Sequence, residues 1–211
     1  MKSKTEKKNK FPTYPCSLAN NPHWKGEWAT RLGTPLIVEL GCGKGSFTLT
    51  YAQTFPDRFI VGIDVKSDRL YAGAKRATEW NINNVRFLRT DIFILTEIFN
   101  NNEVDGMWLT FPDPYPKKKH IRRRLTSPYY LEQYSKILKP QATVQLKTDS
   151  RSLYEYTLEM LALQPVEILA YTPNLYQSPY LNEENSILTD YETKFLAQGL
   201  NTHYIRFRFQ N

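Results

Sequence analysis

One carboxylate followed by a block of cations is the feature of this sequence with the clearest chemical content. Asp113 stands in the tract Phe111–Pro116, in which every second residue is a proline. Six cations follow within eight positions, at Lys117–Lys119 and Arg122–Arg124, and no acidic residue separates them. Like charges this dense repel one another unless an anion binds, so the block predicts a surface for nucleic-acid phosphate, the alternative being a solvated helix face. The prolines would hold Asp113 in a fixed position beside that surface.

The positive charge of the chain is local. The formal net charge of the 211 residues is +7, and the cation block alone carries six of those charges. Residues 1–10 add a net +4, which leaves the remaining chain at −3. We therefore expect one basic patch and one basic arm. Residues 1–20 are predicted to form this flexible arm, either binding a partner or only aiding solubility, and residues 21–211 to form a single domain.

Several classes of protein are disfavoured by composition. The N-terminus is polar and the apolar runs are short, which predicts neither a signal peptide nor a membrane span. Two cysteines, Cys16 and Cys42, and three scattered histidines predict no structural disulfide, no metal site and no hydrolase triad. The expected location is a reducing, cytoplasmic compartment.

Apolar runs alternate with segments of helical period, which predicts an α/β fold: a doubly wound sheet with helices on both faces. The seven expected strands are Leu36–Leu40, Phe59–Asp64, Val85–Arg89, Gly106–Phe111, Thr143–Lys147, Glu167–Tyr171 and His203–Phe209. The expected helices are Ser46–Thr54, Ser67–Trp80, Pro128–Leu138 and Ser150–Leu163. The last strand alternates apolar with polar residues, which is typical of an antiparallel edge strand on a mostly parallel sheet.

A glycine-rich turn follows the first expected strand, with Gly41, Gly43 and Gly45 at alternate positions. Such a turn lets the backbone approach a ligand closely, and the next helix points its amides at the same place. A dinucleotide-binding loop would need a glycine at position 46, where this chain has Ser46. The shorter loop is similar to that of S-adenosylmethionine-dependent methyltransferases.

Acidic residues accompany this loop. Glu39 precedes it, Asp64 ends the next expected strand, and Asp91 stands at the end of the third. Each alone could be a helix or turn cap, but ligands of open α/β sheets bind at the carboxyl ends of the strands, where all three would lie. Carboxylates there favour a ligand that carries a sulfonium and an ammonium cation over a pyrophosphate.

Near the C-terminus, Thr189-Asp-Tyr-Glu192 has the spacing of a capping box, and Asp149 stands where a helix cap would. Spacing alone favours these local roles, and for Tyr191 it favours packing over base stacking.

Five motifs together closely resemble the bacterial tRNA (guanine-N7)-methyltransferase family, over about Asn21–Phe209. They are Val38–Phe47, Phe111–His120, Arg122–Thr126, Lys147–Asp149 and Thr189–Phe195. The resemblance implies a Rossmann-like fold, S-adenosyl-L-methionine as methyl donor without a metal, and tRNA as the partner of a monomer or homodimer. The implied product is 7-methylguanosine at position 46 of tRNA, in the variable loop.

The resemblance also assigns residues. Cofactor binding falls on Glu39, Asp64, Asp91 and Asp113, to which the turn adds Gly41, Gly43 and Gly45. Substrate binding falls on Lys117, Asp149, Thr189, Asp190, Tyr191 and Glu192, and RNA contact on Lys119, His120, Ile121, Arg122, Arg123 and Arg124. The chain departs from the family at Tyr115, usually Trp, and at Lys119, usually Arg, and it lacks the N-terminal Arg-x-Arg-His segment of many members. Lys119 cannot offer the bidentate geometry of arginine.

The implied reaction needs no strong base, because guanine N7 already carries an in-plane lone pair. Asp113 is the predicted catalytic residue, stabilising the positive charge that moves from sulfur to purine. Asp149 or Glu192 could accept hydrogen bonds from guanine N1–H and N2–H. Two alternatives remain: a methyltransferase acting on another RNA base or a protein, and a non-catalytic RNA-binding protein, which need not bind the methyl donor in calorimetry.

Overall fold

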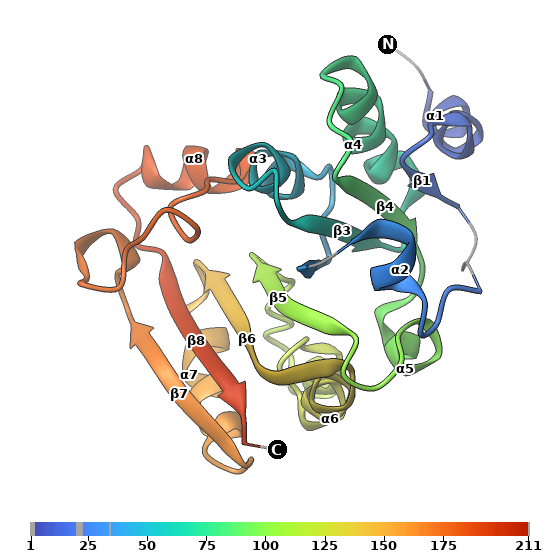
Figure 1. Cartoon of the computed structure of the whole chain (residues 1–211). Coiled ribbons are helices and arrows are strands. Elements are labelled where there is room, and N and C mark those ends of the chain that lie inside the picture. The colour runs from blue at the N-terminus through green and yellow to red at the C-terminus, as the bar shows by residue number, and fades with distance from the viewer. Residues whose placement is uncertain (1–2, 20–22, 34, 211) are drawn as a thin grey trace.

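The structure, a computed structural model, describes residues 3–19, 23–33 and 35–210. Within them an eight-stranded sheet runs through the molecule in the order β1-β4-β3-β2-β5-β6-β8-β7 (Figure 1). The strands are β1 (Ser17–Leu18), β2 (Leu36–Leu40), β3 (Phe59–Asp64), β4 (Val85–Arg89), β5 (Val104–Thr110), β6 (Leu138–Thr148), β7 (Val166–Thr172) and β8 (His203–Phe209). The α/β prediction is confirmed.

Helices cover both faces of this sheet (Figure 1). The α-helices are α1 (Lys4–Lys10), α2 (Trp28–Leu32), α3 (Ser46–Thr54), α4 (Ser67–Glu79), α5 (Leu95–Ile98), α6 (Pro128–Ile137), α7 (Arg151–Leu161) and α8 (Asp190–Leu196). Short 3-10 turns are η1 (Phe11–Thr13), η2 (Ile92–Ile94), η3 (Lys118–Arg123) and η4 (Leu175–Gln177). None of the helices in the described ranges combines the length and the apolar character needed to cross a membrane.

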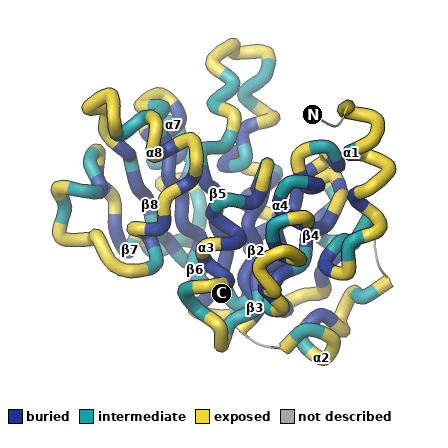
Figure 2. Tube along the Cα trace, turned by 90° about the horizontal axis from the view of Figure 1, so that it is seen from above, coloured by how far each residue is buried: buried dark blue, intermediate teal, exposed yellow. Residues whose placement is uncertain are grey.

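The central strands are buried on both faces, as Figure 2 shows by their dark colour. Along β2, Leu36, Val38 and Leu40 pack into one hydrophobic core with α2, α5, α6 and α7, while Ile37 packs into a second core with α3 and α4. Successive side chains of a strand point to opposite faces, so near-continuous apolar runs are what a doubly covered parallel sheet requires. The carboxyl ends of β2 to β5 therefore share one edge of the molecule.

The C-terminal strand β8 is antiparallel as predicted, but it lies one strand inside the edge of the sheet. β8 pairs antiparallel with β6 on one side and with β7 on the other, so β7 forms the edge of the sheet. β1 adds an eighth strand at the opposite edge, where it pairs in parallel with β4. Its two residues are too few to carry a readable period.

The N-terminal segment differs from the flexible arm predicted over residues 1–20. Its described part forms α1, η1 and β1, and Phe11 is fully buried in the core beside α4. Ser3 and Glu6 cap α1 reciprocally: the Glu6 amide donates to Ser3 Oγ (3.2 Å) and the Ser3 amide to Glu6 Oε2 (2.6 Å). The predicted domain boundary between residues 20 and 21 lies outside the described residues.

Candidate active site

A cavity of about 490 Å³ opens at the carboxyl edge of the sheet. It brings together Gly41, after β2, and three carboxylates predicted from sequence: Asp64 at the end of β3, Asp91 after β4 and Asp113 after β5. Because parallel strands end at the same edge, residues as far apart as Gly41 and Asp113 meet here. The cavity is thus lined by acids on several sides.

The glycine turn is shaped by its three positive φ angles, +74° at Gly41, +57° at Gly43 and +70° at Gly45, a region that other residues rarely adopt. A Cβ at Gly45 would lie 2.4 Å from the Phe87 ring, so this glycine is also required for packing. Gly41 lines the cavity; Gly43 and Gly45 do not line it and instead shape the turn.

Asp64 fixes the turn against the next strand. Its Oδ2 accepts from the Gly43 amide (3.1 Å) and its Oδ1 from the Lys66 amide (2.8 Å). Burial raises the pKa of the Asp64 carboxyl, while these amides and the Arg69 guanidinium lower it. Asp91 is exposed, and one of its oxygens accepts from the Phe93 amide (3.0 Å) at the start of η2. Both carboxylates keep lone pairs free for a ligand.

Glu39 lies beneath the turn and does not line the cavity. It is 1% exposed and accepts hydrogen bonds from the hydroxyls of Thr48, on α3, and Thr110 (2.5 Å), at the end of β5. Burial raises the pKa of this carboxyl to about 7, although the threonine bonds favour its charged form. Glu39 thus connects the glycine turn, α3 and β5.

Glu39 should give the protein a pH-dependent loss of stability. Below about pH 4.5 the Glu39 carboxyl is protonated in the folded and in the unfolded protein. Between pH 4.5 and about 7 it loses its proton only in the unfolded chain, so the folded protein becomes less stable as pH rises. Replacing Glu39 with glutamine should remove this loss, worth ~3 kcal/mol above pH 7. Urea unfolding at pH 5 and pH 8 checks it, with the exposed Glu79→Gln as control. If the free energy of unfolding of the glutamine variant, relative to that of the unmodified protein, does not increase from pH 5 to pH 8, the expectation is contradicted.

The proline tract after β5 is bent by two strained residues. Phe111 (φ +49°) and Tyr115 (φ +41°) adopt the left-handed region although each precedes a proline. Such a conformation costs about 1–3 kcal/mol per residue and persists only where the surroundings impose it. Arg124 holds the second of these residues, because its guanidinium donates to the carbonyls of Pro114 (2.9 Å) and Tyr115 (3.2 Å). The Phe111 amide in turn donates to the Lys147 carbonyl (2.8 Å).

Arg124 corrects the prediction that the whole cation block contacts RNA. It is 6% exposed, and its guanidinium lies 4.4 Å from the centre of the Tyr156 ring. We therefore assign Arg124 to holding the proline tract. The other five cations of the block, Lys117, Lys118, Lys119, Arg122 and Arg123, are exposed on or beside η3, and Arg123 reaches the cavity. His120 and Ile121 lie half-buried in the same turn.

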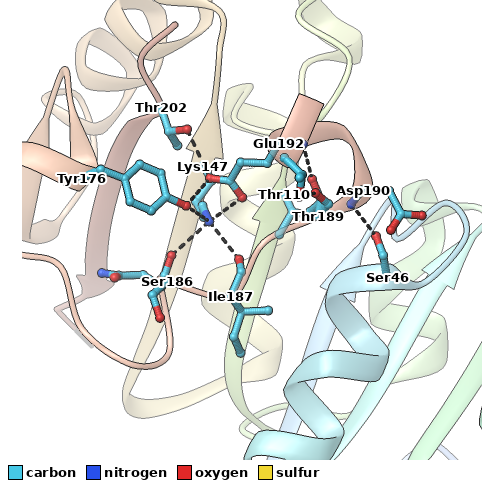
Figure 3. A network of polar contacts seen from close by, with 12 residues as sticks. Ser46, Thr110, Lys147, Tyr176, Ser186, Ile187, Thr189, Asp190, Glu192 and Thr202 are labelled. Atoms are coloured by element: carbon cyan, nitrogen blue, oxygen red, sulfur yellow. Dashed lines mark hydrogen bonds and ion pairs between the residues drawn. The ribbon is translucent and has the colours of Figure 1, made fainter. Parts of the chain in front are cut away.

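The segment Thr189–Glu192 is fixed by a buried network centred on Lys147 of β6 (Figure 3). Lys147 Nζ binds Glu192 Oε2 (2.6 Å), and both side chains are fully buried. The same Nζ donates to the carbonyls of Asn185 and Ile187, each at 3.0 Å. Burial lowers the pKa of Lys147, and the Glu192 carboxylate opposes this shift.

The sequence left Glu192 as one of two candidates for accepting hydrogen bonds from guanine. In the structure both of its carboxylate oxygens are occupied by other residues, so it is not available for this role. Its Oε1 accepts from the hydroxyls of Tyr176 (2.8 Å) and Thr202 (3.1 Å), while Oε2 is held by Lys147. The predicted capping box is half present: Thr189 Oγ1 accepts from the Glu192 amide (2.9 Å), but the Glu192 side chain turns inward.

The start of α8 also contacts the glycine turn. The Asp190 amide donates to Ser46 Oγ (3.2 Å), on the first residue of α3, as Figure 3 shows. Asp190 further lies 3.9 Å from the Arg76 guanidinium. The substrate segment predicted from the C-terminus is thus anchored on the turn predicted for the cofactor.

Asp149 and Tyr191 extend the site beyond the first cavity. The Tyr191 hydroxyl donates to Asp149 Oδ2 (2.7 Å), which raises the pKa of the tyrosine. The Tyr191 ring is 53% exposed and lies 5.4 Å, centre to centre, from Phe111, which lines the cavity. Asp149 also lines a separate hollow of about 670 Å³ together with His203. An open aromatic surface therefore joins Asp149 to the first cavity.

Sequence reasoning missed several members of this site. Lys66 and Arg69, at the start of α4, and Ile92 and Phe93, of η2, line the cavity. The position of Lys147 could have been noticed in the sequence. It is a cation at the end of the mainly apolar strand Thr143–Lys147, which was expected to lie inside the sheet. A charge at such a position requires a buried partner.

The comparisons with known proteins agree on one group. A family model described as a putative methyltransferase matches residues 33–205. The tRNA (guanine-N(7)-)-methyltransferase of Bacteroides thetaiotaomicron is 39% identical over 92% of this chain and 79% of that protein. The protein of the same name from Listeria monocytogenes is 32% identical over 99% of this chain and 98% of its own length.

Solved structures agree at the level of the fold. The 16S rRNA methyltransferase KamB matches with a TM-score of 0.66 at 13% identity, covering 89% of this chain and 93% of that one. An antibiotic-related methyltransferase matches with a TM-score of 0.62 at 17% identity, covering 86% and 92%.

Proposed function

The chain belongs to the tRNA (guanine-N(7)-)-methyltransferase family, and we propose that its acid-lined cavity holds S-adenosyl-L-methionine while a tRNA guanine enters beside Asp113. The reaction is methyl transfer from this donor to N7 of a guanine in tRNA, giving 7-methylguanosine. The observation that carries the placement is the convergence of Asp64, Asp91 and Asp113 on one cavity with the glycine turn.

The cavity suits this donor chemically. Its three carboxylates complement a ligand with a sulfonium and an ammonium group. Asp64 and Asp91 are placed to accept hydrogen bonds from ribose hydroxyls or amines, because neither spends all its lone pairs on the protein. The exposed Phe93 ring at the rim offers an apolar surface for the adenine.

When bound, the donor supplies an electrophilic methyl group on a cationic sulfur. The protein must align that methyl with guanine N7 at a separation of about 3–3.5 Å and exclude water. Asp113 stands at the mouth without a hydrogen bond from any described residue, on a backbone that Arg124 and three prolines make rigid. Its carboxylate stabilises the positive charge as it passes to the purine.

Guanine recognition belongs to Asp149 in this proposal. Its carboxylate can accept from N1–H and N2–H, a donor pattern that adenine lacks, and Tyr191 holds it in place. The exposed Tyr191 ring, with the half-buried Phe111 ring against it, offers the base a stacking surface. Thr189 and Asp190 place α8, while Lys117 lies at the beginning of the exposed cation segment.

We extend the proposal to guanine 46 of the variable loop as the target, and to the cytoplasm, with its tRNA, as the location. The experiment that tests the function is incubation of the protein with labelled S-adenosyl-L-methionine and unmodified tRNA, followed by nucleoside analysis. Labelled 7-methylguanosine is expected, and transcripts in which guanine 46 is replaced should take up no label. Label in another nucleoside would refute the proposed substrate atom.

The exposed cations should control the salt dependence of tRNA binding. Replacing Lys117, Lys119 and Arg122 with glutamine should weaken binding and reduce the slope of log affinity against log salt by ~0.7–0.9 for each phosphate that is no longer neutralised. Filter binding over a potassium chloride series measures this slope. A matched control replaces Arg31, Lys75 and Lys136, which lie in exposed i,i+4 ion pairs elsewhere. If both triple variants lower the affinity for tRNA and the salt slope equally, the exposed cations beside η3 are not the tRNA-binding surface.

A further inference from the structure

A second, basic cavity of about 400 Å³ adjoins the first and shares Val65 and Lys66 with it. Its other cations come from elements far apart in the sequence: Lys4 and Lys8 from α1, and Arg89 from the end of β4. Asp68 is the one acidic residue among the described residues that line it. The site described above assigns none of Lys4, Lys8 and Arg89 a role.

The N-terminal segment is built to hold these lysines there. The burial of Phe11 and the pairing of β1 with β4 place α1 against α4 (Figure 1). Lys4 and Lys8 are four residues apart, so they lie on the same face of the helix. Glu6, the acidic residue of this helix, accepts from the Ser3 amide, so its carboxylate is turned to the cap.

The three cations that belong to this cavity alone are left without an ion-pair partner in the described structure. Within residues 3–19, 23–33 and 35–210, no ion pair involves Lys4, Lys8 or Arg89. Cations gathered around one hollow raise a local positive potential that a docked anion relieves. Four cations against the single acid Asp68 among its described lining residues make this cavity a favourable place for a phosphate.

We propose that this second cavity binds a backbone phosphate of the tRNA substrate. The inference rests on the proposed function and adds to it a contact surface on α1, α4 and β4, separate from the cation segment on η3. Lys66 and Arg123 both line the first cavity, so each of the two basic surfaces contributes a cation to it. The RNA chain that carries the target guanine is then held on both sides of the reacting base, which fixes the position of that base.

Paired charge reversals on α1 test the proposal. One variant carries Lys4→Glu and Lys8→Glu; the control carries Lys7→Glu and Lys10→Glu, with the same change of net charge on the same helix and outside the cavity lining. The first should weaken tRNA binding roughly 10-fold or more and lower the salt slope by about 0.7–1.8, which corresponds to one or two phosphates. The control should shift affinity less than about 2-fold, as a long-range charge effect does under screening.

A third variant, Arg89→Gln, tests the same cavity without changing α1. It should also lower the slope of log affinity against log salt. Calorimetry with S-adenosyl-L-methionine should give the same affinity for all variants, and urea unfolding should give the same midpoint. Equal effects of the two double variants, or an unchanged slope in Arg89→Gln, would overturn the proposal. If the variants change the salt dependence of tRNA binding as expected but the wild type forms no 7-methylguanosine, the proposed function fails while the phosphate site stands.

Discussion

Replacing Asp113 with alanine is expected to lower the turnover number by on the order of 10²-fold while the Kd for unmodified tRNA stays nearly the same. The carboxylate stands at the cavity mouth and no described residue donates to it, so its charge faces whatever binds there. Its effect should appear where positive charge moves from sulfur to the purine ring, and tRNA affinity should come from the cation segment and the aromatic surface. Single-turnover rates at saturating tRNA, together with filter binding, separate the two.

The isosteric Asp113→Asn variant separates charge from shape. It should lose nearly as much turnover as alanine, because an amide keeps the volume and loses the negative charge. Asp57→Ala is the matched control, since Asp57 is also an exposed aspartate but precedes β3, at the opposite edge of the sheet. A loss confined to tRNA binding, or full turnover in Asp113→Asn, would place Asp113 outside the reacting centre.

The sequence predicted those parts of the fold that depend on local pattern. β2, β3, β4 and β8 begin and end where predicted. The buried strands β2 and β3 read as apolar runs bounded by turn or acidic residues, and β8 alternates apolar with polar residues. Asp64, Asp91 and Asp113 could be placed in one site for a topological reason: each follows a parallel strand. The helix α1 was readable from its Ser3-x-x-Glu6 spacing, but its lysine-rich composition favoured disorder.

The errors concern charged residues whose surroundings come from distant segments. Arg124 belongs to a run of exposed cations in sequence, and only the folded chain places the carbonyls of Pro114 and Tyr115 around its guanidinium. Glu192 has the spacing of a capping residue, yet its partner Lys147 is 45 positions away. A buried ion pair of this kind leaves no periodic signal, apart from a single charge in an apolar strand.

The buried pair of Lys147 and Glu192 should be highly sensitive to a single substitution. Lys147→Met removes the cation and leaves the fully buried Glu192 carboxylate without one, which should lower the free energy of unfolding by about 3–5 kcal/mol. The loss should be concentrated at α8, because Lys147 also holds the Asn185 and Ile187 carbonyls of the segment leading into it. Urea unfolding measures the total, and hydrogen exchange of the Thr189–Glu192 amides locates it.

The double variant Lys147→Met with Glu192→Gln distinguishes an uncompensated charge from lost packing. It should recover part of the stability lost in Lys147→Met, because no charge is then buried alone, and a double-mutant cycle gives the coupling between the two side chains. Enough folded protein should remain at low temperature for kinetics, in which KM for tRNA rises while the affinity for S-adenosyl-L-methionine changes little. This split follows from the geometry. Asp190 of α8 binds Ser46, next to the glycine turn, and pairs with Arg76 of α4, whereas Tyr191 of the same helix orients Asp149. No coupling in the cycle, or an equal loss of cofactor and tRNA affinity, would show that the pair does not specifically position the tRNA side of the site.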